Sequence, residues 1–187
     1  TRVAVPFAER RRVEGGAISE GEVWGRAWEV AWFHLRGQVP EAWRGRSVAA
    51  RLDLGGEGLV YRNAGEIVQG ISVGSTWDPS FRRDVLPLFA TADGGEEIDL
   101  WVEVSAAALF GVSLDADPRP EDPQRHGRWE PRVRMLRLVV LDEEAWHFAQ
   151  DLRVLLGLIR RLPEKGTRRA RLLRAGDAAA DQYAGQR

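Results

Sequence analysis

The sequence predicts a mainly β protein, an antiparallel β-sandwich followed by C-terminal α-helices. Two observations predict this class. Short apolar stretches, several with the two-residue period of strands, recur up to about residue 141, and the period becomes helical from Asp142 onward. Short strands separated by turn signals are typical of sandwiches and barrels and not of parallel sheets. We therefore expect a sandwich domain over residues 1–141 and a helical region over residues 142–187.

Turn signals separate the expected strands. Residues 46–54 alternate apolar and polar side chains, as a half-buried strand does, and residues 97–105 do the same. Residues 40–45 contain Pro and Gly and indicate a turn. Asn63–Gly65 predicts a compact turn between two short strands. The expected strands are residues 28–37, 46–54, 58–62, 66–71, 97–105 and 132–142.

The helical region begins with recognisable capping chemistry. Asp142 is a residue type that caps helices, and Glu143 and Glu144 favour the positive end of the helix dipole. These features predict a helix that runs to about residue 161 and ends near Pro163, and a second helix from Thr167. The apolar residues at spacings of three and four are Trp146, Ala149, Leu152, Leu155, Leu156 and Ile159.

The composition excludes several classes of function. The net charge of −1 gives no overall field that would attract nucleic acid or an anionic membrane. No apolar run approaches the roughly 18 residues of a membrane-spanning helix. We therefore expect neither nucleic acid nor membrane as a partner. The chain has no cysteine, which excludes disulfides, thiolate catalysis and Cys-ligated zinc.

The glycine-rich stretch 51–70 raises the question of what Glu57 does between two glycines. A phosphate loop needs a following Lys and Ser or Thr, and a dinucleotide fingerprint needs a third glycine where Tyr61 stands; neither pattern is met. Glu57 could pair with Asp53 as two catalytic carboxylates, the arrangement that glycosidases use. We favour a structural role, in which the glycines and Glu57 shape adjoining short strands.

The histidines give no metal motif. His34, His126 and His147 lie far apart in the sequence, and none begins a His-x-Asp or His-x-x-x-His pattern. We therefore expect no metal and no other cofactor within this chain.

The chain has eight tryptophans, and aromatic side chains can stack on sugars. Trp24, Trp28 and Trp32 are expected in the core or in an interface. Trp77 and Trp129 stand in predicted loops, which makes them the candidate residues for contact with a sugar or a protein partner.

A basic run follows the first predicted helix. It lacks interleaved aromatic residues, so we expect a solvated helix face or a docking face for another domain and not a nucleic-acid site. Its members are Arg160, Arg161, Lys165, Arg168, Arg169, Arg171 and Arg174.

Several motifs, taken in order, resemble the N-terminal region of α-mannosidases of glycoside hydrolase family 38, in particular the cytosolic and bacterial type. The likeness covers most of residues 20–175 and includes the stretches 94–111 and 141–163. Its motifs are Trp32-Phe33, Pro40-Glu41-Ala42-Trp43-Arg44-Gly45, Asp53, Glu57-Gly58-Leu59-Val60 and Gln69-Gly70. The chain departs from the family at Ala107-Ala108, where many relatives have Asn-Gly, and at His34, where a basic residue is common.

The resemblance implies a galactose-binding-like jelly roll that leads through helices into a catalytic domain. In the family that domain carries a His-x-Asp zinc motif and an Asp nucleophile, and we expect both to lie outside this chain, so no catalytic residue is carried over. The parent protein would be a cytoplasmic, zinc-dependent retaining α-mannosidase that acts on terminal α-mannosides. The chain alone is expected to be inactive, to pack against the catalytic domain and to support a homo-oligomer.

Two alternatives stay open. The domain could be a carbohydrate-binding module that recognises mannose-containing oligosaccharides through Trp77 and Trp129. It could instead be a pure interaction domain, which predicts a large apolar patch on the helices. That patch would lie around Leu155, Ile159, Leu172 and Leu173.

Overall fold

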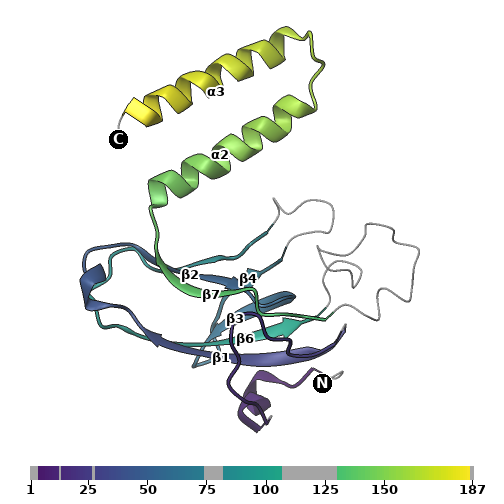
Figure 1. Cartoon of the computed structure of the whole chain (residues 1–187), viewed down its shortest axis with the longest axis vertical. Helices are drawn as coiled ribbons and strands as arrows, with labels where there is room; N and C mark the ends of the chain where they lie inside the picture. Colours follow the sequence, from purple (N-terminus) through teal and green to yellow (C-terminus); the bar gives the residue numbers. More distant parts are fainter. Residues whose placement is uncertain (1–3, 13, 27, 74–81, 107–129, 186–187) are drawn as a thin grey trace. The chain divides into compact units, whose positions relative to one another are not determined.

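The computed structural model describes residues 4–12, 14–26, 28–73, 82–106 and 130–185 (Figure 1). These residues form seven strands in two antiparallel sheets, followed by two α-helices. The prediction of a mainly β sandwich with C-terminal helices is confirmed. The chain divides into two compact units, Thr1–Leu141 with the sheets and Asp142–Arg187 with the helices.

The first sheet has four strands in the order β1-β6-β3-β4. They are β1 (Val30–Gln38), β6 (Glu97–Ser105), β3 (Glu57–Arg62) and β4 (Ile67–Ile71). The central strand β6 pairs with β1 over the whole length of both. β3 and β4 form the predicted hairpin, and its turn is closed by Gly65, whose N–H donates to the Arg62 carbonyl over 2.9 Å and whose φ is 97°.

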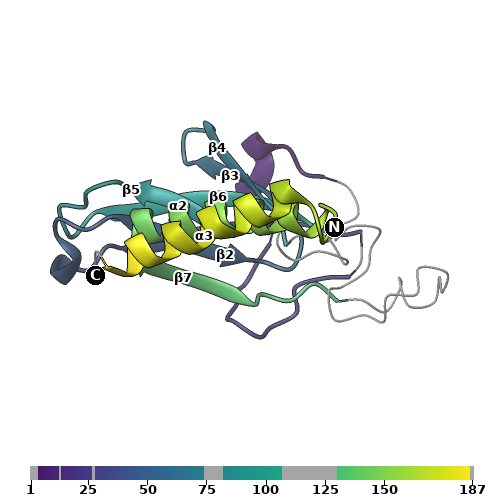
Figure 2. The same cartoon turned by 90° about the horizontal axis from the view of Figure 1, so that it is seen from above.

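The second sheet has three strands in the order β5-β2-β7 (Figure 2). They are β5 (Val85–Phe89), β2 (Val48–Asp53) and β7 (Met135–Val140). The sequence did not predict β5, because Pro87 argues against a strand. Proline is tolerated in edge strands, where a missing N–H need not break a ladder. β5 is such an edge, and Pro87 lies opposite Ala49 beside a bulge in β5.

The six predicted strands are all present, and several are shorter than expected, two of them for reasons that the structure shows. The strand expected from residue 28 starts at Val30, because Trp28 has a φ of 68° that breaks the extended backbone. The strand expected from residue 132 starts at Met135, because Val133 donates its N–H to the Glu22 carbonyl over 3.0 Å instead of joining the β2–β7 ladder.

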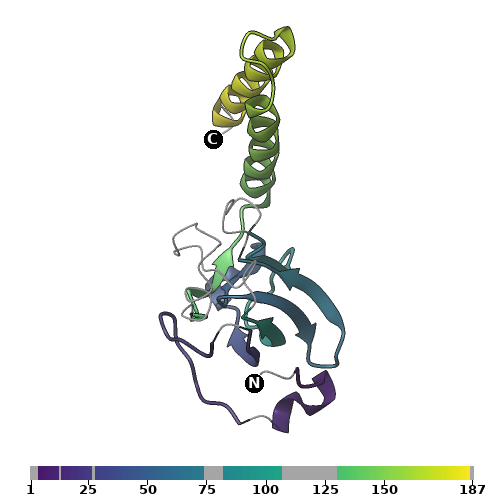
Figure 3. The same ribbon diagram turned by 90° about the vertical axis from the view of Figure 1, so that its right-hand side faces the viewer.

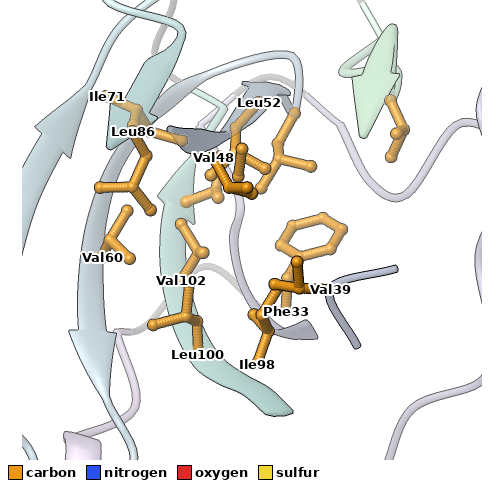
Figure 4. Close-up of a cluster of buried hydrophobic side chains, with 14 of the residues drawn as sticks. Phe33, Val39, Val48, Leu52, Val60, Ile71, Leu86, Ile98, Leu100 and Val102 are labelled. Carbon is orange, nitrogen blue, oxygen red and sulfur yellow. The ribbon is translucent and has the colours of Figure 1, made fainter. Parts of the chain in front are cut away.

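The core lies between the inner faces of the two sheets (Figure 4). Alternate residues of β6 and β2 point into it, as the two-residue period of strands requires. The buried residues on these two strands include Ile98, Leu100, Val102, Val104, Val48, Ala50 and Leu52. Trp24 packs against this core: its indole N–H donates to the Leu54 carbonyl over 2.6 Å, and its ring meets Phe33 edge to face.

The N-terminal segment lies outside the two sheets and contacts their strands (Figure 3). Hydrogen bonds connect it to β7. The segment begins with the 3₁₀ helix η1 (Phe7–Arg12). Farther along, Glu20 accepts two hydrogen bonds from the Arg137 guanidinium, at 2.9 and 2.7 Å, and one from the Leu136 N–H. The Arg137 hydrogen bonds, followed by the Leu136 bond, lower the pKa of Glu20 to about 2.

The helical unit is an antiparallel pair, α2 (Glu143–Arg160) and α3 (Thr167–Gly185), as the sequence predicted. Phe148 stacks on Tyr183 across the pair, with ring centroids 4.3 Å apart, and Ile159 is buried. Of the residues around which an apolar patch was expected, Ile159 is therefore covered, whereas Leu173 is exposed. The large apolar side chains that these helices expose are Val154, Leu156, Leu158 and Leu173. Among the described residues, no helix has the length and hydropathy needed to cross a bilayer.

We expect Asp142→Ala to weaken the start of α2. The Asp142 carboxylate accepts the Ala145 N–H over 2.9 Å, which is the N-cap bond that the sequence predicted. Loss of such a cap costs about 1 kcal/mol, equivalent to about a fivefold loss of hydrogen-exchange protection. Exchange of the amides in the first turn of α2 measures it. Asp151→Ala, in the exposed middle of the same helix, is the control, and equal protection in both variants would contradict the cap.

Candidate functional site

The outer face of the four-stranded sheet carries polar and aromatic side chains. The inner face takes alternate residues of β3 and β6, so Glu57, Leu59, Glu103 and Ser105 belong to the outer face. In the ladder, Glu57 lies opposite Ser105, and Leu59 lies opposite Glu103. Glu57 and Glu103 are therefore diagonal neighbours on adjacent strands, within reach of one ligand.

A pocket of about 570 Å³ opens on this face. Its charged lining residues are Glu57, Glu103 and Arg83, and Ser72 and Ser105 add hydroxyl groups. The larger apolar side chains in its wall are Val30 and Leu59, while Ile71 of β4 lines it with a side chain that packs in the core. The pocket thus joins residues from β1, β3, β4, β6 and the bridge between Ser72 and Arg83.

Both carboxylates of this pocket are half-buried. Burial raises the pKa of Glu57, and a hydrogen bond from the Ser72 hydroxyl, 3.0 Å from Glu57 Oε1, acts in the opposite direction. Burial also raises the pKa of Glu103. Water that would solvate these carboxylates is partly excluded, so both sites favour added hydrogen-bond donors.

Asp53 does not share this pocket. Its side chain is only 2% exposed and lies 3.8 Å from the Arg82 guanidinium, with the Gly55 N–H donating to it over 3.2 Å. The structure therefore does not combine Glu57 and Asp53 into one acid pair. Glu57 is the first residue of β3 and not part of a turn.

An aromatic cluster covers another part of the same outer face. Phe7, in η1, packs against Trp32 and Tyr61, with ring centroids 5.8 and 4.9 Å away. The Arg10 guanidinium lies 3.5 Å from the Phe7 ring centre and 4.7 Å from that of Trp101. These rings are packed against one another and covered by η1, so they do not present a free aromatic platform.

Residues 1–129 match the family described as "Alpha-mannosidase, jelly roll domain". This chain belongs to that family. The match spans both sheets except β7 and includes every lining residue of the pocket named above. The resemblance to α-mannosidases is therefore confirmed.

Two α-mannosidases that are similar to this chain are much longer proteins. This chain is 32% identical over 105 residues to α-mannosidase G of Dictyostelium discoideum. The alignment covers 56% of this chain and 9% of the relative. It is 29% identical over 167 residues to α-mannosidase 2C1 of Homo sapiens, covering 88% of this chain and 15% of the relative. The chain thus spans a small part of the length of each.

The sequence-predicted contact residues, Trp77 and Trp129, lie outside the described residues of the jelly roll domain. Of the other tryptophans, Trp24 and Trp32 are packed as described, but Trp28 is 57% exposed and belongs to no core. The sequence predicted the indole of Trp28 in the core or in an interface. Nothing in the sequence predicted the positive φ of Trp28 just before β1.

The two described histidines lie on different elements, His34 on β1 and His147 on α2. His34 stacks on Trp101 with ring centroids 4.1 Å apart, and its Nε2 lies 2.7 Å from Asp99. His147 stands on α2, and His126 is not among the described residues. In the part of the jelly roll domain and its helices that the structure describes, no group of three or more potential ligands could hold a metal ion.

Sequence reasoning singled out Glu57 but missed Glu103 and Arg83. Glu103 looks like one more solvent-facing residue in an alternating strand, and Arg83 lies in no predicted element. Only the pairing of β3 with β6, and of Ser72 with Arg83, brings them to Glu57.

We expect Glu103→Gln to stabilise the jelly roll domain at neutral pH. A carboxyl whose pKa is raised in the folded state binds its proton more tightly there than in the unfolded chain. The free energy of unfolding therefore falls as pH rises above the ordinary value near 4.5. Glutamine removes this cost, so the variant should gain less than about 1 kcal/mol at pH 7 and nothing below pH 4.

Urea unfolding at several pH values measures this difference. Glu97→Gln, at the exposed start of the same strand, is the control for losing one negative charge. A Glu103→Gln variant that is less stable than the wild type at pH 7 would show that the charged carboxylate is stabilising.

Proposed function

We propose that this chain is the non-catalytic N-terminal domain of an α-mannosidase that hydrolyses terminal α-mannosides. The single observation that supports this best is the family match to an α-mannosidase jelly roll domain over residues 1–129. The small share of each relative that the chain covers leaves room in such a protein for a separate catalytic domain.

The parent enzyme is proposed to be a cytoplasmic member of glycoside hydrolase family 38. Its catalytic domain would hold a zinc ion on ligands outside this chain, where zinc would position sugar hydroxyls for a retaining mechanism. The jelly roll domain contributes packing and assembly in this proposal, including support of a homo-oligomer.

The helical unit supports a packing role. The side chains of Val154, Leu156 and Leu158 on α2 are 74%, 45% and 42% exposed, and Leu173 on α3 is 39% exposed. Val154 and Leu158, four positions apart, lie on one face of α2 and leave apolar surface that a partner domain can bury. The catalytic domain of the same protein is the proposed partner.

The first test separates the chain from the rest of the full-length protein. We expect the purified chain to leave an aryl α-mannoside unhydrolysed in the presence of zinc. We expect the remaining part to lose most of its activity or solubility alone and to regain it when both parts are co-expressed. Hydrolysis by the chain itself, or full activity without it, would overturn the proposal.

A second test addresses the helix surface within the full-length protein. The double variant Val154→Gln and Leu158→Gln removes exposed apolar side chains while keeping residues that favour helices. We expect a lower yield of assembled enzyme. The matched control is Asp151→Gln with Arg153→Gln, two exposed polar residues of the same helix. Equal yields for both pairs would contradict packing through this surface of α2.

A further inference from the structure

The pocket on the outer face of the four-stranded sheet brings together two carboxylates and one guanidinium from separate strands and a bridge. Burial of Glu57 and Glu103 has a cost in stability, since the surroundings disfavour both charged forms. A structural strand pair would be more stable with neutral residues at these positions. Two carboxylates maintained at such a cost, together with Arg83 in the same wall, indicate a binding role.

We propose that this pocket binds one hexopyranose unit of a neutral saccharide, with Glu57 and Glu103 accepting hydrogen bonds from its hydroxyl groups and Arg83 donating to its oxygens. Its volume of about 570 Å³ lies within the range of small-molecule sites, about 300–1,000 Å³. The proposal concerns binding alone and stands independently of the catalytic role of the parent enzyme.

The charges of the pocket select against other ligands. An anion would meet two carboxylates, and a bare metal ion would meet the Arg83 guanidinium with only two carboxylates to hold it. A neutral molecule with several hydroxyl groups can donate to the carboxylates and accept from the arginine at once. Such hydrogen bonds to charged groups are stronger than those between neutral groups.

The remaining walls fit the other half of a sugar. Leu59 lines the pocket beside the carboxylates, and Val30 adds a second apolar side chain. A pyranose ring has an apolar C–H face as well as polar edges, so a site with an apolar wall and a few convergent polar groups suits it. The Ser72 hydroxyl already donates to Glu57 Oε1 over 3.0 Å, which holds that carboxylate in place for a ligand.

The test is isothermal titration of the chain with methyl α-mannoside, mannobiose and galactose. We expect saturable millimolar binding of at least one sugar. Glu57→Gln and Glu103→Gln should each weaken it at least about tenfold, because each removes a charged acceptor. Glu97→Gln, on β6 but outside the pocket lining, should bind as the wild type does. Melting curves of every variant check that the fold is kept.

Three results would overturn the proposal. The first is absence of heat with every sugar at tens of millimolar. The second is binding that survives both glutamate variants but is lost in Trp77→Ala or Trp129→Ala, which would place the sugar on the loop tryptophans. The third is binding of 1,4-diaminobutane in place of sugars, which would make this a cation pocket. None of these results depends on α-mannosidase activity, so a failure here is distinguishable from a failure of the proposed function.

Discussion

Gly56→Ala is expected to destabilise the sandwich by about 3 kcal/mol and to lower its melting temperature by about 10 °C. A Cβ on Gly56 would overlap the Ser105 carbonyl oxygen and would stand 2.9 Å from the carbonyl carbon. Ser105 cannot move away, because it lies in the central strand β6 and is paired with Val30 on one side and Glu57 on the other. The backbone must therefore distort. Thermal unfolding followed by tryptophan fluorescence measures the effect.

Gly70→Ala is the matched control for this substitution. Gly70 lies in β4 of the same sheet, and the nearest atom to an added Cβ is the Gly58 carbonyl oxygen at 3.8 Å, an ordinary contact. We expect it to change stability by less than about 1 kcal/mol. If Gly56→Ala melted at the same temperature as Gly70→Ala, the β2–β3 connection would not pass as close to β6 as the structure shows.

Leu52→Ala is expected to lower the free energy of unfolding by about 3–4 kcal/mol. Leu52 is 2% exposed and lies in β2, the middle strand of the three-stranded sheet. Alanine removes buried methyl groups and leaves a cavity that strands paired on both sides cannot fill by collapsing. Urea unfolding, with the slope compared between variant and wild type, measures the change.

The control for Leu52→Ala is Ile67→Ala, an apolar truncation in a strand at a side chain that is 58% exposed. We expect it to cost less than about 1 kcal/mol, because little apolar area leaves the core. If Leu52→Ala also lowered the free energy of unfolding by less than about 1 kcal/mol, the space between the sheets would not be tightly packed.

Local signals in the sequence were sufficient for the long, regular elements. The alternation in 97–105 coincides with β6, and the cap at Asp142 and the start at Thr167 coincide with the helices. Each of these depends on neighbouring residues only. Two predictions failed, because Pro87 lies in a strand and Trp28 ends one, against the usual preferences of these residue types. For Pro87 the position in an edge strand decides, and a sequence does not reveal which strand is an edge.

The candidate site was predicted only in part, for a related reason. Glu57 drew notice because it stands between glycines, and the structure explains those glycines by the close passage of the chain at Gly55 and Gly56. Glu103 and Arg83 join it through pairings with distant segments, which periodicity cannot predict. The loop tryptophans Trp77 and Trp129 stay a prediction.

The strand order has a consequence for how the domain is made in the cell. β6 lies between β1 and β3, yet it is the last strand of its sheet to be synthesised, and β7, the last of the other sheet, follows it. A nascent chain that ends before Glu97 therefore has no partner for β1 and nothing to connect β1 to the β3–β4 hairpin. Such a chain exposes apolar strand faces and unpaired edges until β7 has left the ribosome. Completion of both sheets therefore waits for β6 and β7, so the yield of the domain should depend on chaperones and on the speed of translation across β5 and β6.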